Sequence, residues 1–215
     1  MGWVAVMSAG DFPNRGYGDA AGYLDAYRDE IDRAWRSVDR QAVAAAGEVL
    51  ETCYKRGNQV FCCGNGGSAA ISNHLACDHL KGVRTGSDLA PKVVSLSQNV
   101  ELITAIANDM SYADVFKYQL ESLAAPGDVA FLISASGASE NITRAARWAR
   151  ENGLHTIGLC GFTGGELARL AEVHVHVASS NYGIVEDVHQ GIMHILAQYL
   201  RQKGMSDGTI AETRF

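Results

Sequence analysis

Two loops rich in glycine and serine have the composition of an anion-binding site. The first, residues 64–68, reads GNGGS, and the second, residues 134–139, reads SASGAS; each directly follows an apolar run. Glycines let backbone N–H groups approach a ligand closely, and a helix that starts after such a loop favours negative charge. Three hydroxyls at a helix start can also surround a phosphate without any cation. The alternative is that these residues only form turns and cap helices.

Two further segments carry side chains that could hold a divalent metal. His74 and Asp78 are four residues apart, so on a helix they share one face. Near the C-terminus, Glu186, His189 and His194 lie in one apolar segment. Ideal helix geometry places Glu186 roughly 12 Å from His194 along the axis, so a shared ion would need an irregular helix start or side chains reaching it from different directions. The alternatives are a simple hydrogen-bonded pair on the first helix and a core or interface histidine at 189.

The elements that must position these groups alternate between strands and helices. The pattern predicts five short, almost entirely apolar strands, each followed by a helix. Such strands are typical of a parallel sheet that is covered on both faces. The expected strands are residues 59–63, 92–96, 128–133, 155–160 and 173–177, and the helices after them are residues 68–80, 101–108, 140–152, 167–170 and 184–203. The fold class is therefore α/β, a single doubly wound domain with a five-stranded parallel sheet.

Two helices are predicted before the first strand, within residues 19–56. Aromatic residues recur there at helical spacing, among them Tyr23, Tyr27 and Trp35. Two long helices exceed what a small sheet needs for cover, so we expect them to pack against other subunits. Residues 1–18 are predicted to be irregular, residues 19–203 to form the domain, and residues 204–215 to be a tail.

The bulk composition narrows the class of partner. The chain has 215 residues, 47% of them hydrophobic, and a net charge of −6, which does not favour nucleic acid or an anionic membrane. No apolar run approaches the roughly 20 residues of a membrane span. The five cysteines have no CxxC spacing and are interpreted as reduced structural thiols. We therefore expect a cytoplasmic protein that acts on a small molecule.

The GNGGS and SxSGxS loops together resemble the sugar-phosphate isomerase (SIS) domain family. The resemblance covers residues 19–203 and implies that the second loop binds the phosphate of a sugar phosphate. Within that family, the chain resembles the phosphoheptose isomerases, which have a histidine six residues after the GNGGS serine and an acid four residues later. These positions are His74 and Asp78 here. The run from Glu186 to His194 is similar to their QExHxxxxH pattern.

This resemblance implies roles for individual residues. It implies one zinc ion per subunit, held by His74, Asp78, Glu186 and His194. It also implies acid–base roles at Asp78 and His194, and a homotetramer with sites near subunit interfaces. The positions implied to contact substrate are Asn65, Gly66, Gly67, Ser68, Asn108, Asp109, Ser134, Ala135, Ser136, Ser139 and Glu186.

The chain departs from the family pattern at two of these positions. The first-helix acid is usually Glu in the best-known members and is Asp78 here, and the family's glutamine position is Glu186 here. The base that removes the substrate proton is therefore either Asp78 or Glu186.

We expect an isomerase that interconverts sedoheptulose 7-phosphate and D-glycero-D-manno-heptose 7-phosphate through a metal-assisted enediol. The alternatives are an isomerase for another phosphosugar, and a SIS-fold protein that binds a phosphosugar as a regulator or scaffold without chemistry. The presence of the His and acid set favours the enzyme.

Overall fold

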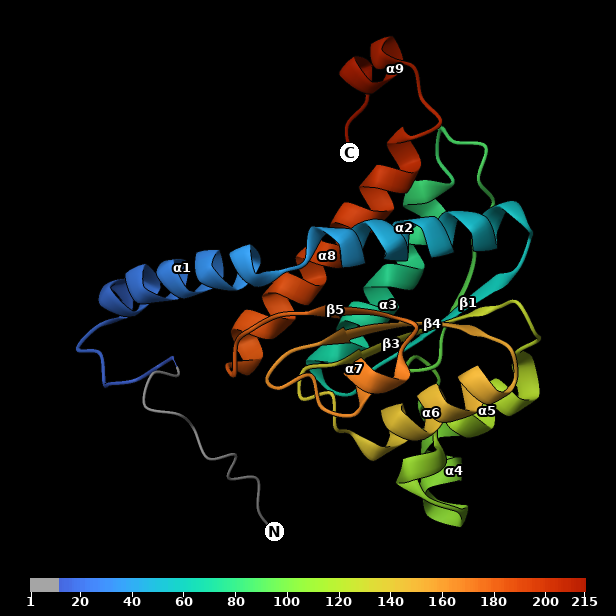
Figure 1. The fold of residues 1–215 in the computed structure, drawn as a ribbon, viewed down its shortest axis with the longest axis horizontal. Coiled ribbons are helices and arrows are strands. Elements are labelled where there is room, and N and C mark those ends of the chain that lie inside the picture. Colours follow the sequence, from blue (N-terminus) through green and yellow to red (C-terminus); the bar gives the residue numbers. More distant parts are fainter. Residues whose placement is uncertain (1–11) are drawn as a thin grey trace.

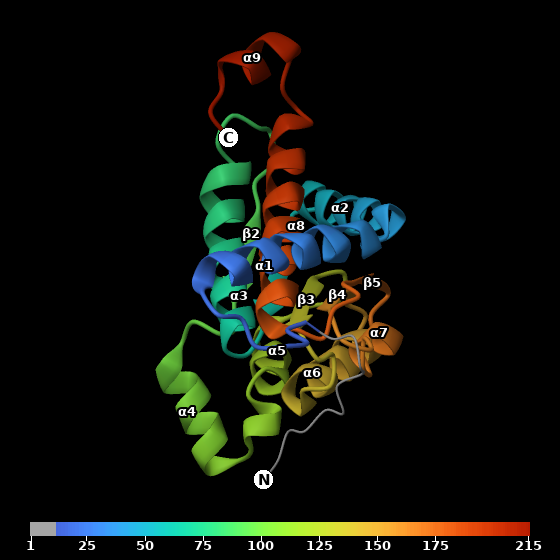
Figure 2. The same ribbon diagram turned by 90° about the vertical axis from the view of Figure 1, so that its left-hand side faces the viewer.

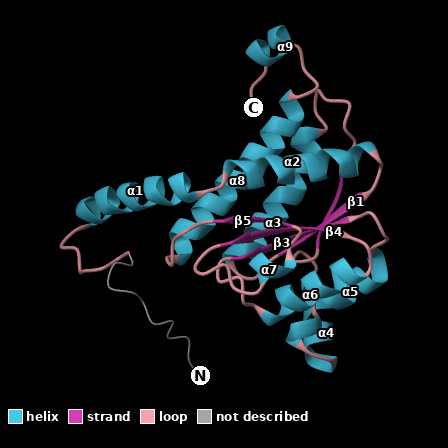
Figure 3. Ribbon diagram, in the orientation of Figure 1, coloured by secondary structure: helices cyan, strands magenta, loops and turns pink. Residues whose placement is uncertain are grey.

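A five-stranded parallel sheet forms the centre of the molecule (Figure 3). The computed structural model describes residues 12–215. The strand order is β2-β1-β3-β4-β5, with β3 at the centre and all of its residues buried. The strands are β1 (Gln59–Cys63), β2 (Lys92–Ser95), β3 (Val129–Ser134), β4 (His155–Cys160) and β5 (Val173–His176). The predicted fold class is confirmed, and the strand ends differ from expectation by at most one residue.

Helices cover both faces of this sheet, as a parallel sheet requires (Figure 1). One layer consists of α1 (Ala20–Ser37), α2 (Arg40–Lys55), α3 (Gly67–Cys77) and α8 (Tyr182–Gln202). The other layer consists of α4 (Val100–Asp109), α5 (Lys117–Leu123), α6 (Glu140–Glu151) and α7 (Leu167–Leu170). None of the helices within residues 12–215 is long and apolar enough to cross a membrane.

Alternation along the strands divides the core into two clusters. Phe131 and Ile133 of β3 contribute to the cluster under α2, α3 and α8. Ala130 and Leu132 of the same strand contribute to the cluster under α5 and α6. Successive side chains of a strand point to opposite faces, so one short strand anchors both helix layers.

Helix α1 is the element that depends least on the sheet. It begins after Asp19, whose carboxylate accepts a hydrogen bond from the Gly22 backbone N–H at 2.7 Å. It crosses α8 in Figure 2 and extends beyond the sheet in Figure 1. Its partly buried residues, including Tyr27 and Trp35, pack on the cluster that contains α8.

Several short elements lie outside the predicted pattern. The helix expected over residues 68–80 is α3 followed by a π-helix, η1 (Asp78–Val83). A 3-10 helix, η2 (Tyr112–Asp114), and α5 precede β3, and a further helix, α9 (Asp207–Glu212), lies in the predicted tail. Of the predicted irregular N-terminus, residues 1–11 lie outside the described residues, and residues 12–18 contain no helix or strand.

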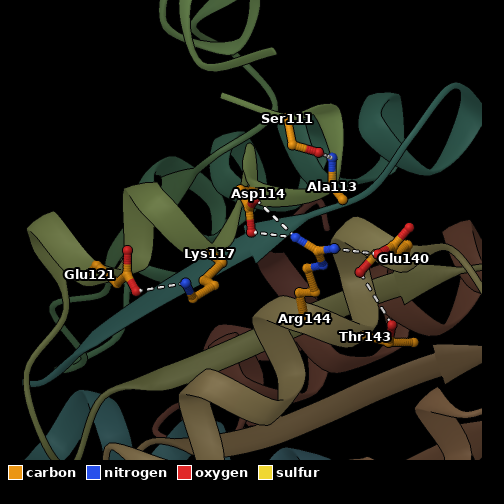
Figure 4. A network of polar contacts seen from close by, with 8 residues as sticks. All are labelled: Ser111, Ala113, Asp114, Lys117, Glu121, Glu140, Thr143 and Arg144. Carbon is orange, nitrogen blue, oxygen red and sulfur yellow. Dashed lines mark hydrogen bonds and ion pairs between the residues drawn. The ribbon is translucent and has the colours of Figure 1, made fainter. Parts of the chain in front are cut away.

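A polar network joins η2 to α6 (Figure 4). The Arg144 guanidinium donates to both carboxylate oxygens of Asp114 at 2.9 Å and also pairs with Glu140. Ser111 caps η2 by accepting from the Ala113 backbone N–H. These contacts fix η2 beside the start of α6, where the second glycine- and serine-rich loop ends.

Candidate active site

A cavity of about 130 Å³ lies beyond the carboxyl ends of β1 and β3. Strand β2 lies on one side of β1, and β3 lies on the other side of β1. The direction in which the chain adds strands therefore reverses between β1 and β3. Ligands of open parallel sheets bind at such a reversal. The cavity is lined by Asn65, Ser68, Ile133, Ser134, Ala135, Ser136, Ser139, Tyr182 and Glu186.

The SASGAS loop forms one wall of this cavity and opens helix α6. Ser139 is the N-cap residue, yet its side chain makes no capping hydrogen bond, and its hydroxyl lies 3.3 Å from that of Ser134. The first N–H groups of a helix have no partner within the helix. Serine hydroxyls next to the first N–H groups of a helix suit an anionic group such as phosphate.

The GNGGS loop forms the opposite wall and is tied to the SASGAS side by amides. Asn65 and Asn141 exchange two hydrogen bonds of 2.9 Å, and the Tyr112 hydroxyl donates to Asn65 Oδ1 at 2.8 Å. Gly66 has φ 56°, a left-handed conformation that favours glycine, and precedes α3. The two loops therefore form one rigid pocket built on adjacent strands.

Glu186 is the acidic residue of this cavity. It lies in the first two turns of α8, a helix that begins where Asn181 Oδ1 accepts from the Ile184 backbone N–H. A Cβ atom on Gly67 would collide with the Glu186 carboxylate, so the glycine permits this approach to the start of α3. The pKa of Glu186 is raised above its ordinary value. Burial is the larger cause, and the nearby charge of Asp187 is the smaller one.

A second group of polar side chains lies further along α3 and α8. His74, Asp78 and His194 each offer a ligand atom within 4.8 Å of the other two. His74 Nε2 lies 3.3 Å from one Asp78 oxygen, and His194 Nε2 lies 3.7 Å from the other. Two ligands of a tetrahedral zinc ion, each bound at about 2.1 Å, are separated by roughly 3.4 Å. The three side chains thus fit a divalent metal such as zinc.

The structure does not bring Glu186 into this group. Among the described residues, the cluster of potential ligands from His, Cys, Asp and Glu contains His74, Asp78 and His194 only. A side chain absent from the sequence prediction, Gln190, contacts both histidines: its Nε2 lies 2.9 Å from His74 Nδ1 and 3.1 Å from His194 Nε2. Its position four residues before His194 is the sequence signal that could have indicated it.

His189 lies on a different face of α8 from this group. It is fully buried, and burial lowers its pKa to about 4, so it is neutral near pH 7. Of the two interpretations of this residue, the structure supports a core histidine.

The other predicted substrate contacts divide into two sets. Asn65, Ser68 and the four predicted residues of the SASGAS loop line the cavity, and Gly66 and Gly67 lie in the loop beside it. Asn108 and Asp109 lie exposed at the end of α4, are not among its lining residues, and hydrogen-bond to each other at 2.7 Å. Tyr182, 52% exposed at the cavity wall, was not predicted; its ring is tilted by 54° against that of Phe162, with the ring centroids 4.8 Å apart.

Comparison with known proteins agrees with this geometry. The family model of the SIS domain matches residues 23–161. A phosphoheptose isomerase of Roseiflexus sp. (strain RS-1) is 35% identical over 182 residues, which make up 83% of this chain and 91% of that protein. A phosphoheptose isomerase of Clostridium acetobutylicum is 38% identical over 156 residues, 73% of this chain and 79% of the relative.

Solved structures give the same answer. A phosphoheptose isomerase from Francisella tularensis superposes with a TM-score of 0.78 at 27% identity, covering 85% of this chain and 96% of that one. The phosphoheptose isomerase from Neisseria gonorrhoeae superposes with a TM-score of 0.76 at 28% identity, covering 84% of this chain and 95% of that one.

The fold and the two loops define an α/β protein with a ligand cavity beyond the carboxyl ends of its strands. The chain belongs to the SIS domain family and, within it, to the phosphoheptose isomerases, a family of sugar-phosphate isomerases. The predicted family and the predicted enzyme class are confirmed.

Proposed function

We propose that this protein interconverts sedoheptulose 7-phosphate and D-glycero-D-manno-heptose 7-phosphate through an enediol. One observation carries the proposal: Glu186 lines the cavity of the serine loop, and the His and acid set lies further along the same helix, α8, and along α3 beside it. A phosphate site, an acidic residue in the same cavity and a group that fits a metal together suit the isomerisation of a phosphosugar.

The phosphate is held by the SASGAS loop in this proposal. Ser134, Ser136 and Ser139 supply hydroxyls, and the start of α6 supplies unpaired N–H groups. No lysine or arginine is among the residues lining the cavity. Binding therefore depends on hydrogen-bond geometry, so the pocket positions the phosphorylated end of the sugar.

Proton transfer is assigned to Glu186 and His194. Glu186 lies in the cavity, and its raised pKa suits a general base, whereas Asp78 is engaged by two histidines. Glu186 removes the proton from the carbon next to the carbonyl, and the enediol regains a proton on the neighbouring carbon. His194 moves a proton between the two oxygens. A zinc ion held by His74, Asp78 and His194 would polarise the carbonyl and the adjacent hydroxyl.

The experiment that tests this function follows the sugar itself. Purified protein is stripped of metal, then restored with zinc, and conversion of sedoheptulose 7-phosphate is followed by NMR. Zinc-dependent appearance of the aldoheptose phosphate supports the proposal. Binding of the phosphosugar without turnover, with or without zinc, would favour the regulator or scaffold instead.

Replacing His194 by glutamine tests the assigned chemistry. We expect His194→Gln to lower kcat/KM by about 10²–10⁴-fold, because a proton-transfer group is lost. His155→Gln is the matched control, since His155 begins β4, at the end of the strands opposite the cavity, and pairs with Glu172. A His194→Gln protein with the wild-type rate would contradict the proposal.

A further inference from the structure

A third glycine-rich loop, residues 161–165, lies beside the SASGAS loop and has no part in the proposed function. It reads GFTGG and follows β4, the strand next to β3. The Gly161 N–H donates to the Ala135 carbonyl at 2.8 Å, and a Cβ on Gly137 would collide with the Gly164 carbonyl oxygen. The GFTGG loop is therefore packed closely against one wall of the cavity.

Phe162 of this loop is held in a backbone conformation that side chains rarely adopt. Its φ is 50°, and among residues 12–215 it is the one residue other than glycine with a positive φ. Such a conformation costs free energy and persists only where its surroundings fix it. Here the Phe162 N–H donates to the Ser179 carbonyl at 2.8 Å, and His176 Nε2 donates to the Phe162 carbonyl at 2.9 Å. These two contacts fix the position of the phenyl ring.

The Phe162 ring lies against Tyr182, the aromatic residue of the cavity wall. Their ring centroids are 4.8 Å apart, a separation at which aromatic rings attract each other. Tyr182 is the first residue of α8, and half of its surface remains exposed. The cavity is otherwise lined mainly by hydroxyl, amide and carboxyl groups. Tyr182 therefore supplies a large and partly apolar surface, held in place from the GFTGG loop, that a bound molecule can cover.

The position of Tyr182 along α8 indicates which part of a phosphosugar this surface meets. Tyr182 and Glu186 are four residues apart, and both line the cavity. His194 lies further along the helix in the same direction, roughly 12 Å beyond Glu186. Tyr182 is thus separated from the metal-fitting group by the proposed base. A ring at this position meets carbons of the sugar chain that do not react.

We propose that Tyr182 binds the carbon chain of the phosphosugar and that Phe162 positions the Tyr182 ring. The inference rests on the proposed function, because it concerns the same cavity and the same substrate. The C–H groups of a sugar chain can pack on an aromatic ring, while the SASGAS loop holds the phosphate. Carbons that do not react make the same contact in the substrate and in the transition state. The contact should therefore lower KM and leave kcat unchanged.

Two probes separate the carbon chain from the phosphate. Equilibrium dialysis of the zinc-loaded protein gives the Kd of sedoheptulose 7-phosphate and of inorganic phosphate, and NMR gives kcat. We expect Tyr182→Ala to weaken phosphosugar binding by about tenfold, with phosphate binding and kcat within about twofold of wild type. Tyr182→Phe, which keeps the ring, should stay within about threefold. Tyr118→Ala is the matched control, because Tyr118 is 39% exposed on α5 and does not line the cavity.

The role of Phe162 is tested with Phe162→Gly, which removes the ring and suits the positive φ. We expect this change to weaken phosphosugar binding by about threefold in the wild-type background and to have no further effect in Tyr182→Ala. A further loss in the double variant would show that Phe162 does not act through the Tyr182 ring, and would overturn its role as a positioning residue.

The remaining outcomes distinguish failure of this inference from failure of the proposed function. Wild-type affinity for the phosphosugar in Tyr182→Ala, or equal weakening of both probes, would overturn the inference and leave the proposed function standing. A smaller mass of Tyr182→Ala in light scattering would assign the ring to a subunit contact and overturn it as well. Phosphosugar binding without turnover would refute the isomerase, while the two Kd values would still decide the role of Tyr182. A wild-type protein that does not bind sedoheptulose 7-phosphate would overturn both. Circular dichroism checks folding, and Tyr182→Leu replaces Tyr182→Ala if that variant unfolds.

Discussion

Glu186 shows how the surroundings of one carboxyl group define its role. Its side chain shares a cavity with serine hydroxyls and lies against Gly67, where any larger residue would displace it. Burial disfavours the charged form, and Asp187 disfavours a second negative charge nearby. A carboxylate that is hard to ionise holds a proton more readily once it has taken one, which is the property of a general base.

The pH dependence of activity tests this role. A base must be deprotonated, so kcat/KM should fall as the pH is lowered through the pKa of Glu186. That pKa is raised, so the fall should begin above the ordinary glutamate value of about 4.3. Glu186→Gln should remove this acid limb and lower kcat/KM by about 10²–10⁴-fold. A Glu186→Gln protein that keeps both the rate and the acid limb would identify Asp78 as the base.

At the scale of elements, helix α8 connects the site to the N-terminal helices. Its Gln190 side chain contacts His74 of α3, and the neighbouring Gly191 receives the Trp35 ring from α1. The Tyr27 hydroxyl also donates to Asp187 at 2.6 Å. Helix α1 therefore supports the segment of α8 that carries the candidate base and metal ligand, although α1 itself lines no part of the cavity.

Two helical glycines provide a matched test of this packing. A Cβ on Gly191 would overlap the Trp35 indole, so Gly191→Ala should lower the free energy of unfolding by about 1–3 kcal/mol. A Cβ on Gly47 of α2 would have a Tyr199 ring carbon as its nearest neighbour at 3.6 Å, which is an ordinary van der Waals contact. Gly47→Ala should therefore raise the free energy of unfolding by about 0.4–1 kcal/mol. Urea unfolding at one fixed protein concentration measures both, and equal effects would refute the proposed role of α1.

At the scale of the whole molecule, one apolar surface has no cover within the described chain. A groove of about 470 Å³ lies between α1, α2 and α8, and its lining includes Trp35, Val43, Ile195 and Tyr199. Ile195 remains 47% exposed and Tyr199 44% exposed. Contiguous apolar surface of this kind typically marks an interface, and the resemblance to the phosphoheptose isomerases implies a homotetramer. We therefore propose that a second copy of the chain covers the groove.

Light scattering tests this assembly. We expect a mass four times that of the 23.0 kDa chain. Ile195→Asp should lower the mass, because a buried, unpaired carboxylate would destabilise the interface. Leu123→Asp is the matched control: Leu123 is 54% exposed on α5, in the other helix layer, and its substitution should leave the mass unchanged. A wild-type monomer would refute the tetramer.

The sequence alone determined the sheet, both loops and the family. Strands buried on both faces are continuous apolar runs, as in β3 and β4, so their positions can be recognised locally. Residues four apart on one helix, such as His74 and Asp78, share a face whatever the rest of the fold does. The predicted helix after β1 was less accurate, because the change from α3 to a π-helix at Asp78 has no simple sequence pattern.

Only the tertiary structure decided which side chains of α8 meet which side chains of α3. The sequence contains Glu186, Gln190 and His194 at equal spacing, and periodicity cannot tell which of them faces His74. The direction and offset of α3 against α8 place Gln190 at the two histidines and Glu186 at Gly67. Contacts between segments more than a hundred residues apart depend on packing across the whole sheet, and no local pattern in either segment records that packing.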